Sequence, residues 1–519
     1  MSPAAPSFGR KQSVSTHGGL AVTSHPDASE AAAAVLRDGG NACDAALAAA
    51  AMQTVVEPHM TTITGILSML YYDAATGRTE HCNGSMNAPL APLPGFAETD
   101  LETGRAVAVP GFWPAFEATL ARWGSLPKSR IMAPAIAAAE EGFEIYPFLF
   151  GEMFAQSHAL GRTEGGREIF FDGGRLKGPG ELLIQRRAAD TLRRLEADGE
   201  SYFRGEFAQA VCAAAAADSG VITPADFERY EVRWDEPARG TYRGHELVGS
   251  PPPDTGGTHV IEALHMLAHS GIEKLGPPAQ SAEALWLLIA VHNEVLEAGA
   301  KLGDPRSHRV PLSTLLSPSY AAARLELVKA ARAYAPQSQP TGSNHVTVVD
   351  RAGNAATVLH SCMSTPWING LFAAGVSVCS AGTHFLRTMP QPGDRGTCII
   401  APTMVMHARQ PYLVCGSPSM SLIANILQNV VNIVDFGMTL EESVHQPRFG
   451  YPTPDGRQDV EADFPPHVLA GLRDRGVPTR VVSPWYWLNG SLEAIMVDPV
   501  TGLRTACPDP RRTSVAVAE

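Results

Sequence analysis

Alternating and helically spaced apolar positions near the start of the chain predict a strand, two helices and a hairpin. The run "GLAVTS" is a short apolar strand, and the following apolar positions recur at helical spacing up to Gly39-Gly40, a typical helix end. A second, Ala-rich helix begins after Asn41, a favourable N-cap. Two strand-like runs around an Asp-Ala-Ala-Thr-Gly turn in residues 66–84 predict a β-hairpin.

The middle of the chain is predicted to be mostly helical. Helical periodicity runs through residues 106–143 and most of residues 147–235, where Gly-rich loops interrupt it. The stretch "YEVRWDEPARGTYRGHELVGSPPPDTGG" is typical of strands followed by a rigid Pro/Gly turn. Three further helices are predicted at about residues 257–271, 281–302 and 317–334.

Strand-like runs predominate from residue 345 onward. Four of them, "HVTVVD", "AATVLHS", "CIIAPTMVMH" and "PYLVCGS", are separated by turns, and helices follow at about 420–436 and 440–446. The run "VEADF", another helix and a hairpin around "VDPVTGLR" come last. We therefore predict a β-meander closed by helices in the C-terminal third of an α+β layered fold. The linker-like stretch "AYAPQSQPTGSN" places a boundary near 335–343.

Composition and charge narrow the class of protein. The 519 residues are 45% hydrophobic and 18% charged, which is typical of a globular protein. A formal net charge of −13, without a run of Lys or Arg, argues against a nucleic-acid partner. No apolar run approaches the length that spans a bilayer, and the N-terminus has no apolar signal region. We therefore expect a soluble, cytoplasmic protein with no membrane partner.

The eight cysteines are scattered, without a C-x-x-C pair or histidines at zinc-ligand spacing. Buried free thiols are therefore expected, and no metal site is predicted. Four of the eight lie between residues 362 and 415.

Candidate chemistry first arises at Gly342-Ser343, where the linker-like stretch meets a predicted core strand. A hydroxyl at this position can attack the preceding carbonyl in an N→O acyl shift, and glycine leaves that carbonyl sterically open. Cleavage of the resulting ester would leave Ser343 with a free α-amine, whose reference pKa of about 7.7–8 suits a general base for its own hydroxyl. From this feature alone, an ordinary loop serine remains the more common interpretation.

A resemblance to a known family covers nearly the whole chain. It is carried by "AVTSHPDASEAAAAVLRDGGNACDAALAAAAMQTVVEPHM", "VAVPGFWPAFEATLARWGSLPKSRIMAPAIAAAEEGFEI", "ITPADFERYEVRWDEPARGTYRGHELVGSPPPDTGG", "YLVCGSPSMSLIANILQNVVNIVDFGMTLEESVHQPRFGY" and "DPRR". In this order the segments resemble the gamma-glutamyltransferase family of N-terminal nucleophile hydrolases. The resemblance implies a four-layer αββα sandwich, no cofactor, and a precursor that cuts itself into a large and a small subunit that stay associated.

The resemblance also assigns the nucleophile. The family pattern is similar to T-T-H-x-S/T-V-V-D-x-x-G-N, and here the same frame is "SNHVTVVDRAGN". Ser343 therefore takes the position usually held by threonine, which gives a large segment of residues 1–342 and a small segment of residues 343–519. Thr341 is the rival nucleophile, but it would require a two-residue shift of the frame. Five residues hold the register: His345, Thr347, Asp350, Gly353 and Asn354.

Departures from the family pattern concern the substrate pocket. In the family, an Arg, two serines, an Asn and acidic and amide residues hold the head group of a glutamyl donor. The matching positions here carry small, apolar or thiol residues: Ser85 or Asn87, Cys398 and Ile399, Met363, Ala381 and His384. A free α-amino-carboxylate would leave its charges unpaired in such a pocket, so γ-glutamyl compounds are expected to be poor substrates. Arg395 lies near this pocket, either as a partner for a carboxylate or as a rim residue.

The remaining family positions concern the oxyanion and the nucleophile's neighbours. The oxyanion-binding amides are expected from Ser419 and Met420 in "GSPSM", where the family has two glycines. Ser361 is expected to support the nucleophile, whereas His345 and His360 are expected to be structural.

The sequence thus favours an amidohydrolase or acyltransferase that acts on a small amide, ester or thioester and passes the acyl group to water or an amine. One alternative is a conventional glutathione-type γ-glutamyl enzyme, and another is an unprocessed, non-catalytic family member.

Overall fold

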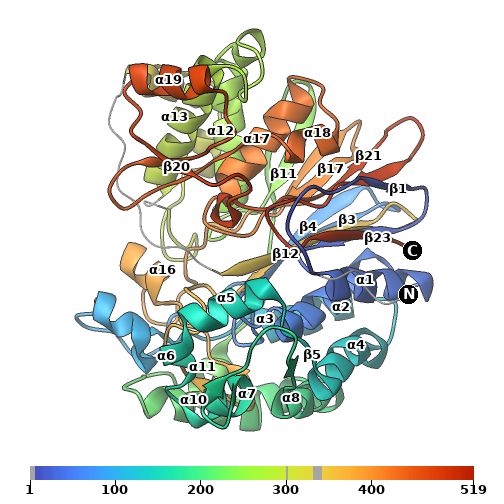
Figure 1. Ribbon diagram of the computed structural model, residues 1–519, viewed down its shortest axis with the longest axis vertical. Helices are drawn as coiled ribbons and strands as arrows, with labels where there is room; N and C mark the ends of the chain where they lie inside the picture. The colour runs from blue at the N-terminus through green and yellow to red at the C-terminus, as the bar shows by residue number, and fades with distance from the viewer. Residues whose placement is uncertain (1–5, 300–301, 331–341) are drawn as a thin grey trace.

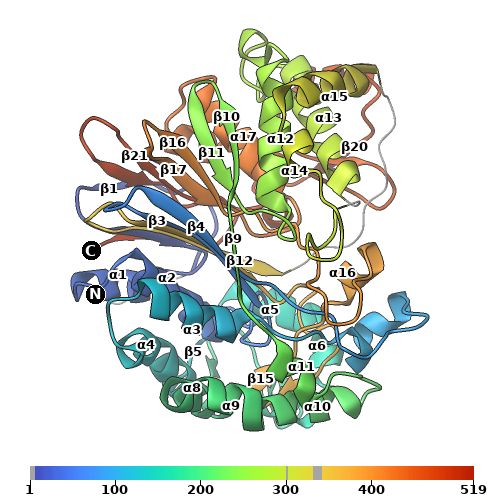
Figure 2. The ribbon, with the colours of Figure 1, turned by 180° about the vertical axis from the view of Figure 1, so that it is seen from behind.

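Two seven-stranded sheets, all of whose strand pairs are antiparallel, stack on each other in the middle of the molecule (Figures 1 and 2). The computed structural model describes residues 6–299, 302–330 and 342–519. Sheet A has the order β1 (Val14–Thr16), β22 (Arg504–Ala506), β21 (Glu493–Val497), β17 (Gln410–Gly416), β16 (Thr403–His407), β11 (His245–Gly249) and β10 (Ala238–Tyr242). Sheet B has the order β23 (Val515–Ala518), β2 (Leu20–Thr23), β12 (Ser343–Val349), β13 (Ala355–Ser361), β3 (Ile66–Asp73), β4 (Arg78–Gly84) and β9 (Arg233–Asp235).

Helices cover the outer face of each sheet, so the molecule has four layers (Figure 1). The layer on sheet B includes α1 (Pro26–Arg37), α2 (Ala42–Val56), α3 (Phe112–Trp123), α4 (Lys128–Glu141), α8 (Arg186–Asp198), α10 (Ala208–Ala216) and α11 (Pro224–Arg229). The layer on sheet A includes α12 (Gly256–Ala268), α13 (Ala282–Gly299), α15 (Pro318–Ala330), α17 (Leu422–Val434), α18 (Leu440–Val444) and α19 (Pro466–Asp474). This arrangement confirms the predicted α+β, αββα sandwich.

Shorter elements complete the described chain. The short helices are α5 (Pro147–Ala155), α6 (Ser157–Leu160), α7 (Glu164–Phe170), α9 (Glu200–Tyr202), α14 (Leu312–Leu315) and α16 (Gly382–Arg387), with single turns η1 (Glu98–Glu102), η2 (Gly104–Ala106), η3 (Phe203–Phe207), η4 (Ile272–Lys274) and η5 (Trp487–Asn489). The small strands are β5 (Phe143–Glu144), β6 (Phe171–Asp172), β7 (Arg175–Leu176), β8 (Leu182–Leu183), β14 (Phe372–Ala373), β15 (Val376–Ser377), β18 (Phe449–Pro452), β19 (Gln458–Glu461) and β20 (Thr479–Val482).

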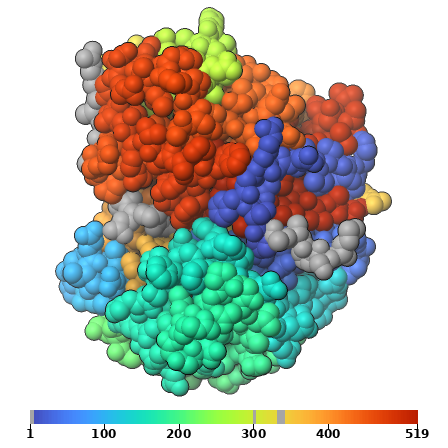
Figure 3. Space-filling view, in the orientation of Figure 1, coloured from blue at the N-terminus to red at the C-terminus, as the bar shows by residue number. Residues whose placement is uncertain are grey.

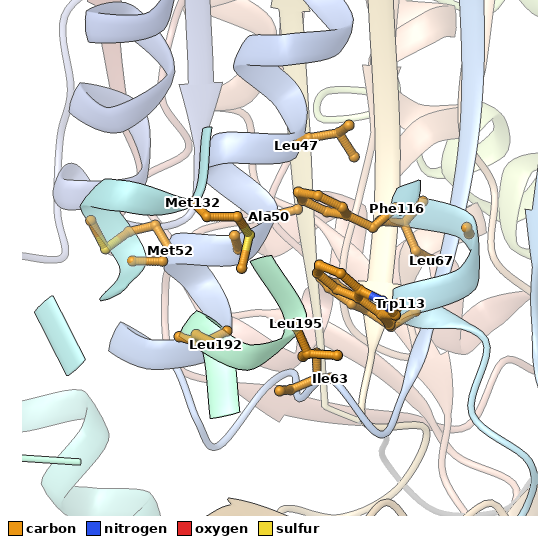
Figure 4. Packing of buried hydrophobic residues seen from close by; sticks show 14 of the residues in the cluster. Leu47, Ala50, Met52, Ile63, Leu67, Trp113, Phe116, Met132, Leu192 and Leu195 are labelled. Carbon is orange, nitrogen blue, oxygen red and sulfur yellow. The ribbon is translucent and has the colours of Figure 1, made fainter. Parts of the chain in front are cut away.

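The Ala-rich helix α2 is buried along almost its whole circumference. Its N-terminus is fixed by a capping box, in which the Asn41 side chain accepts hydrogen bonds from backbone amides and Asp44 bonds back to the cap. Small alanine side chains let neighbouring helices and sheet B approach closely, and larger residues such as Trp113 and Phe116 fill the space beside Leu47 and Leu67 (Figure 4). A helix that is apolar on all sides is expected at the centre of such a layer.

Alternation along β12 decides which residues face the other sheet. Val349 belongs to the apolar cluster between the two sheets, whereas Val346 and Val348 belong to the cluster under the helices of sheet B. Because side chains alternate along a strand, Ser343 lies on the same face as Val349. Ser343 is therefore at the inner face of sheet B, at the first residue of β12.

The prediction of a single C-terminal meander was wrong. Strands β12 and β13 join sheet B, strands β16, β17, β21 and β22 join sheet A, and β23 returns to sheet B. A period of two identifies a strand but does not identify its partner, since both sheets bury their inner faces in the same way. The linker prediction falls largely on residues 331–341, outside the described residues. Segments on either side of that stretch contribute strands to both sheets.

The N-terminal arm runs over the surface beside the C-terminal part of the chain, as the adjacent blue and red regions of Figure 3 show. The Gly9 amide donates to the carbonyl of Pro510 at 3.0 Å, and the Lys11 amide donates to His445 Nε2 at 3.2 Å. In the described residues, we find no helix with the length and apolar character needed to cross a bilayer.

Candidate active site

Three side chains lie in one row across the centre of sheet B. Ser343 on β12 is directly opposite Ser361 on β13, and Ser361 is directly opposite Ile66 on β3. Residues that pair in this way point to the same face of a sheet, so all three face sheet A. The Ser343 hydroxyl is buried and accepts a hydrogen bond of 2.9 Å from the backbone amide of Ser419.

The segment of residues 361–364 holds both polar backbone groups of Gly342. The carbonyl of Gly342 accepts a hydrogen bond of 2.6 Å from Ser361 Oγ, and its amide donates to the carbonyl of Ser364 at 2.8 Å. The Met363 amide donates to Ser361 Oγ at 2.8 Å, which leaves the Ser361 proton directed at the Gly342 carbonyl. The carbonyl before Ser343 is therefore hydrogen-bonded to a hydroxyl on the neighbouring strand.

Space at Gly342 admits only glycine. A Cβ atom there would lie 2.9 Å from the sulfur of Cys362 and 2.9 Å from the carbonyl oxygen of His59. Both distances are below normal van der Waals contact, and the second neighbour is rigid backbone. The requirement for glycine before Ser343 is thus one of close approach.

The turn at Ser419 has the backbone geometry that favours glycine, although its residue is serine. Ser419 has φ +79°, a conformation that costs non-glycine residues about 1 kcal/mol or more. Its hydroxyl donates a hydrogen bond of 2.6 Å to the carbonyl of Leu488, which helps to hold the turn. The side chain of the next residue, Met420, is buried in the cluster under the helices of sheet A. The amide of Ser419 thus still points at Ser343 despite the loss of glycine.

A pair of variants tests how this turn is held. We expect Ser419→Ala to lower the free energy of unfolding by about 1 kcal/mol, since it leaves the Leu488 carbonyl without its donor. Ser419→Gly loses the same bond but relieves the strain of the positive φ, so we expect a net change close to zero. Chemical denaturation of the two variants measures the difference, and a glycine variant no more stable than the alanine variant contradicts this account.

The two histidines near the candidate nucleophile are neutral and hydrogen-bonded within the core. His345 Nε2 lies 2.7 Å from Thr357 Oγ1, while His360 Nε2 lies 2.7 Å from Gln53 Oε1 and its Nδ1 lies 2.7 Å from Thr61 Oγ1. Burial lowers the pKa of each imidazole to about 3. These contacts link β12 and β13 to their surroundings, which is a structural use of both rings.

An apolar cluster begins next to the row of Ser343 and Ser361. It brings together three residues expected in the pocket, Met363, Cys398 and Ala381, with Ile66 at the end of that row. The other buried members of this cluster are Met86, Ala88, Ala108, Leu359, Cys379, Phe385 and Ile400. We call this set the acyl-side cluster. It offers carbon and sulfur atoms, with few polar groups, beside the candidate nucleophile.

Two other expected pocket residues lie at the margins of this cluster. His384 on α16 places Nδ1 at 3.2 Å from the carbonyl of Thr397, and burial lowers its pKa to about 3. Ile399 is half-buried and packs against the cluster under the helices of sheet A. Adjacent residues of this extended segment thus face different clusters, with Cys398 on the acyl side.

The guanidinium group of Arg395 is buried and donates hydrogen bonds to other parts of the chain. Its Nη1 donates to the carbonyl of Ser85 and to the hydroxyl of Tyr230, and its Nη2 donates to the carbonyl of Glu231. The guanidinium carbon also lies 4.6 Å from the centre of the Tyr230 ring. Asn87, whose backbone bridges to Arg395, is half-buried. The charge of Arg395 therefore ties separate chain segments together.

Ser85 is buried and bonded to a carboxyl group that sequence reasoning missed. Its hydroxyl donates to Asp254 Oδ1 at 2.6 Å, and burial raises the pKa of Asp254 to about 7. Asp254 belongs to "SPPPDTGG", which was predicted to be part of a rigid turn. This acidic residue stands in a Pro/Gly-rich turn that follows a core strand. That position in the sequence could have indicated a buried polar contact.

Comparisons with known proteins show the family to which the chain belongs. The chain matches the family description "Gamma-glutamyltranspeptidase" over residues 28–519. It is 32% identical to the Acylase ACY 1 proenzyme of Pseudomonas sp. (strain V22), covering 96% of this chain and 94% of that protein. It is 28% identical to the Glutathione hydrolase proenzyme of Bacillus subtilis (strain 168), covering 96% and 91%. The crystal structure of cephalosporin acylase from Bacillus halodurans superposes with a TM-score of 0.88 at 26% identity, covering 99% and 98% of the two chains.

The αββα sandwich is the fold of the N-terminal nucleophile hydrolases, a class of self-processing enzymes. The protein belongs to the gamma-glutamyltranspeptidase family within that class. The family prediction made from the sequence is thus confirmed, and the relatives include both acylases and glutathione hydrolases.

Proposed function

We propose that Ser343 is the nucleophile of a self-cleaving acylase-like enzyme. In this proposal the chain is cut between Gly342 and Ser343 into a large segment, residues 1–342, and a small segment, residues 343–519, which remain together. The observation that carries it is the hydrogen bond from Ser361 to the Gly342 carbonyl, with the Ser343 hydroxyl beside it on the inner face of sheet B. A carbonyl that is polarised in this way is the electrophile that an N→O acyl shift requires.

Self-cleavage in this proposal has two steps. The Ser343 oxygen bonds to the Gly342 carbonyl carbon, the hydroxyl proton passes to the amide nitrogen, and the C–N bond breaks to give an ester. Water then adds to the ester carbon, and the bond to Ser343 oxygen breaks. The products are a carboxylate on Gly342 and a serine with both a hydroxyl and a free α-amine.

The mature enzyme uses the same serine for acyl transfer. The α-amine takes the proton of the Ser343 hydroxyl, whose oxygen attacks the carbonyl carbon of an amide, ester or thioester and expels the leaving group. Backbone amides of Ser419 and Met420 are the proposed donors to the oxyanion, and the Ser419 amide already contacts Ser343. Water or an amine then takes the acyl group. Met420 enters this step through its backbone, so its side chain can vary.

The proposed acyl donor lacks a free α-amino-carboxylate. The acyl-side cluster contributes Met363 and Cys398, and the buried Arg395 guanidinium uses Nη1 to bind Ser85 and Tyr230 and Nη2 to bind Glu231, which leaves only Nε without a partner among the described residues. An ionised head group without partners in such surroundings loses several kcal/mol of solvation. The similarity to the acylases supports an acylase activity. The similarity to glutathione hydrolases keeps a conventional γ-glutamyl activity as the second candidate.

Cleavage and substrate class are tested on the purified wild-type protein. We expect two bands on a denaturing gel, at about two thirds and one third of 55.1 kDa, and an N-terminal sequence of the smaller fragment that begins at Ser343. A single intact band in fully folded protein contradicts the proposal and supports a non-catalytic family member.

A matched series of anilides tests the donor. Butanoyl, glutaryl and γ-glutamyl anilides share the acyl chain and differ by one carboxylate and then by one ammonium group. We expect kcat/KM for the butanoyl compound to exceed that for the γ-glutamyl compound by about 100-fold, the cost of an unpaired buried head group. A γ-glutamyl anilide that reacts as fast as the butanoyl compound excludes the weakly polar donor and favours the second candidate.

A further inference from the structure

Cys362 makes an additional contact with the proposed scissile peptide. Its sulfur lies 3.6 Å from the carbonyl oxygen of Gly342, within the range of S–H···O hydrogen bonds, while Ser361 Oγ reaches the same oxygen at 2.6 Å. The side chain is 6% exposed, and burial raises the pKa of its thiol to about 11. The sulfur therefore carries its proton and is available as a donor.

The position of Cys362 is fixed by its own backbone. Its amide donates to the carbonyl of Met60 at 3.1 Å, and its carbonyl accepts a hydrogen bond of 2.7 Å from the Cys379 thiol. Two other carbonyls surround the sulfur, those of Ser364 at 3.5 Å and His59 at 3.9 Å. The thiol has one proton and three possible acceptors. It donates this proton preferentially to the carbonyl oxygen that carries the most negative charge.

We propose that Cys362 is a second hydrogen-bond donor to the scissile carbonyl, next to Ser361, and that the two together stabilise the oxyanion of self-cleavage. The inference rests on the proposed function of Ser343. When Ser343 oxygen bonds to the Gly342 carbon, negative charge develops on the Gly342 oxygen. The thiol proton then turns from the neutral carbonyls to this oxygen, so the contact is stronger in the transition state than before it.

This role is confined to the precursor. In turnover, the attacked carbonyl belongs to the substrate, and the proposed donors are the amides of Ser419 and Met420. A thiol that faces the Gly342 oxygen therefore affects the rate of cleavage more than the activity of molecules already cleaved. A purely structural role of Cys362 in the core has no such preference.

The experiment follows cleavage in freshly made wild-type protein and three variants by a denaturing-gel time course. We expect Cys362→Ala to slow cleavage about tenfold, since a weak donor is lost from a site of developing charge, and Cys362→Ser to stay within about threefold of wild type. Cys43→Ala is the matched control, because Cys43 is also buried and its thiol faces the carbonyl of Thr119 at 3.6 Å. It should cleave at the wild-type rate.

Two further measurements on Cys362→Ala decide whether Cys362 acts as a hydrogen-bond donor or only packs in the core. The fraction of cleaved Cys362→Ala protein should have a kcat within about twofold of wild type, and melting temperatures report any general loosening. Equal rates for Cys362→Ala and wild type overturn the inference. So does a serine variant as slow as the alanine variant, or a Cys43→Ala variant slowed to the same extent. Failure of the wild-type protein itself to cleave refutes the proposed function instead.

Discussion

Ser343→Ala should leave the chain as one intact species and remove the acyl-transfer activity. The variant lacks the oxygen that attacks the Gly342 carbonyl, and without cleavage no α-amine is released to act as the base. We expect cleavage and kcat/KM to fall by at least about 10³-fold, the usual effect of deleting a nucleophile. Gel electrophoresis and mass spectrometry after prolonged incubation measure the first effect, and anilide hydrolysis measures the second.

Two matched variants identify the residue that acts. Ser343→Thr keeps the hydroxyl and should still cleave, whereas Thr341→Ala changes the rival position, outside the described residues, and should cleave normally. Cleavage that persists in Ser343→Ala, or that disappears in Thr341→Ala, assigns the nucleophile to another residue. Circular dichroism that matches wild type shows that the alanine variant is folded.

Arg511→Met should destabilise the folded protein strongly. The guanidinium is fully buried, and it donates to Glu461 Oε1 at 2.7 Å and Glu461 Oε2 at 2.5 Å, and to the carbonyl of Val444 at 2.9 Å. Removing it leaves the Glu461 carboxylate buried without its partner, for which we expect a loss of about 3–5 kcal/mol. The midpoint of urea denaturation, compared with that of wild type, measures the loss.

An exposed ion pair supplies the control for this prediction. Arg194 pairs with Glu206 at the surface, so Arg194→Met should leave the denaturation midpoint nearly unchanged. Similar midpoints for the two variants mean that the buried network is not a main source of stability.

The buried ion pairs around Arg511 also reach the candidate active site, because Arg511 Nη1 lies 3.4 Å from Asp509 Oδ1. Arg448, which pairs with Asp509 at 2.6 Å, donates to the carbonyl of Gly490 at 2.9 Å. Gly490 follows η5, whose Leu488 carbonyl holds the Ser419 turn. Burial alone would raise the pKa of Asp509, but Arg448 and Arg511 outweigh it and hold that pKa below its usual value. The ionised network therefore supports the turn that contacts Ser343.

Elements specified by neighbouring residues were predicted well from the sequence. The end of α1 at its glycine pair, the Asn41 cap of α2 and the β3–β4 hairpin follow from local caps, turns and periodicity. The distribution of the C-terminal strands between two sheets was not predicted. Strand pairing is a choice between distant segments with the same alternation, and nothing within one segment records it.

The candidate site was predicted unevenly for a similar reason. The family resemblance selected Ser343 and Ser361, which lie opposite each other. It gave no indication that Arg395 bonds to Tyr230, about 165 residues away, or that Asp254 bonds to Ser85. The role inferred for Cys362 likewise depends on the approach of Gly342, which only the folded chain brings about. Contacts between distant segments carry no periodic signal in the sequence.

The way in which strands from both sides of Gly342 alternate in the two sheets affects how reversibly the cleaved protein unfolds. Sheet B places β12 between β2 and β13, and sheet A places β11 beside β16, so strands from either side of Gly342 are neighbours in both sheets. If the chain is cut at Gly342, the two segments must associate in order to form these sheets. Refolding then becomes a bimolecular reaction, whereas the folding of an intact chain is unimolecular. The unfolding midpoint of cleaved protein should then rise with protein concentration by mass action, whereas that of an intact chain should not. After cleavage, the native state can therefore form again only when the two separate segments meet.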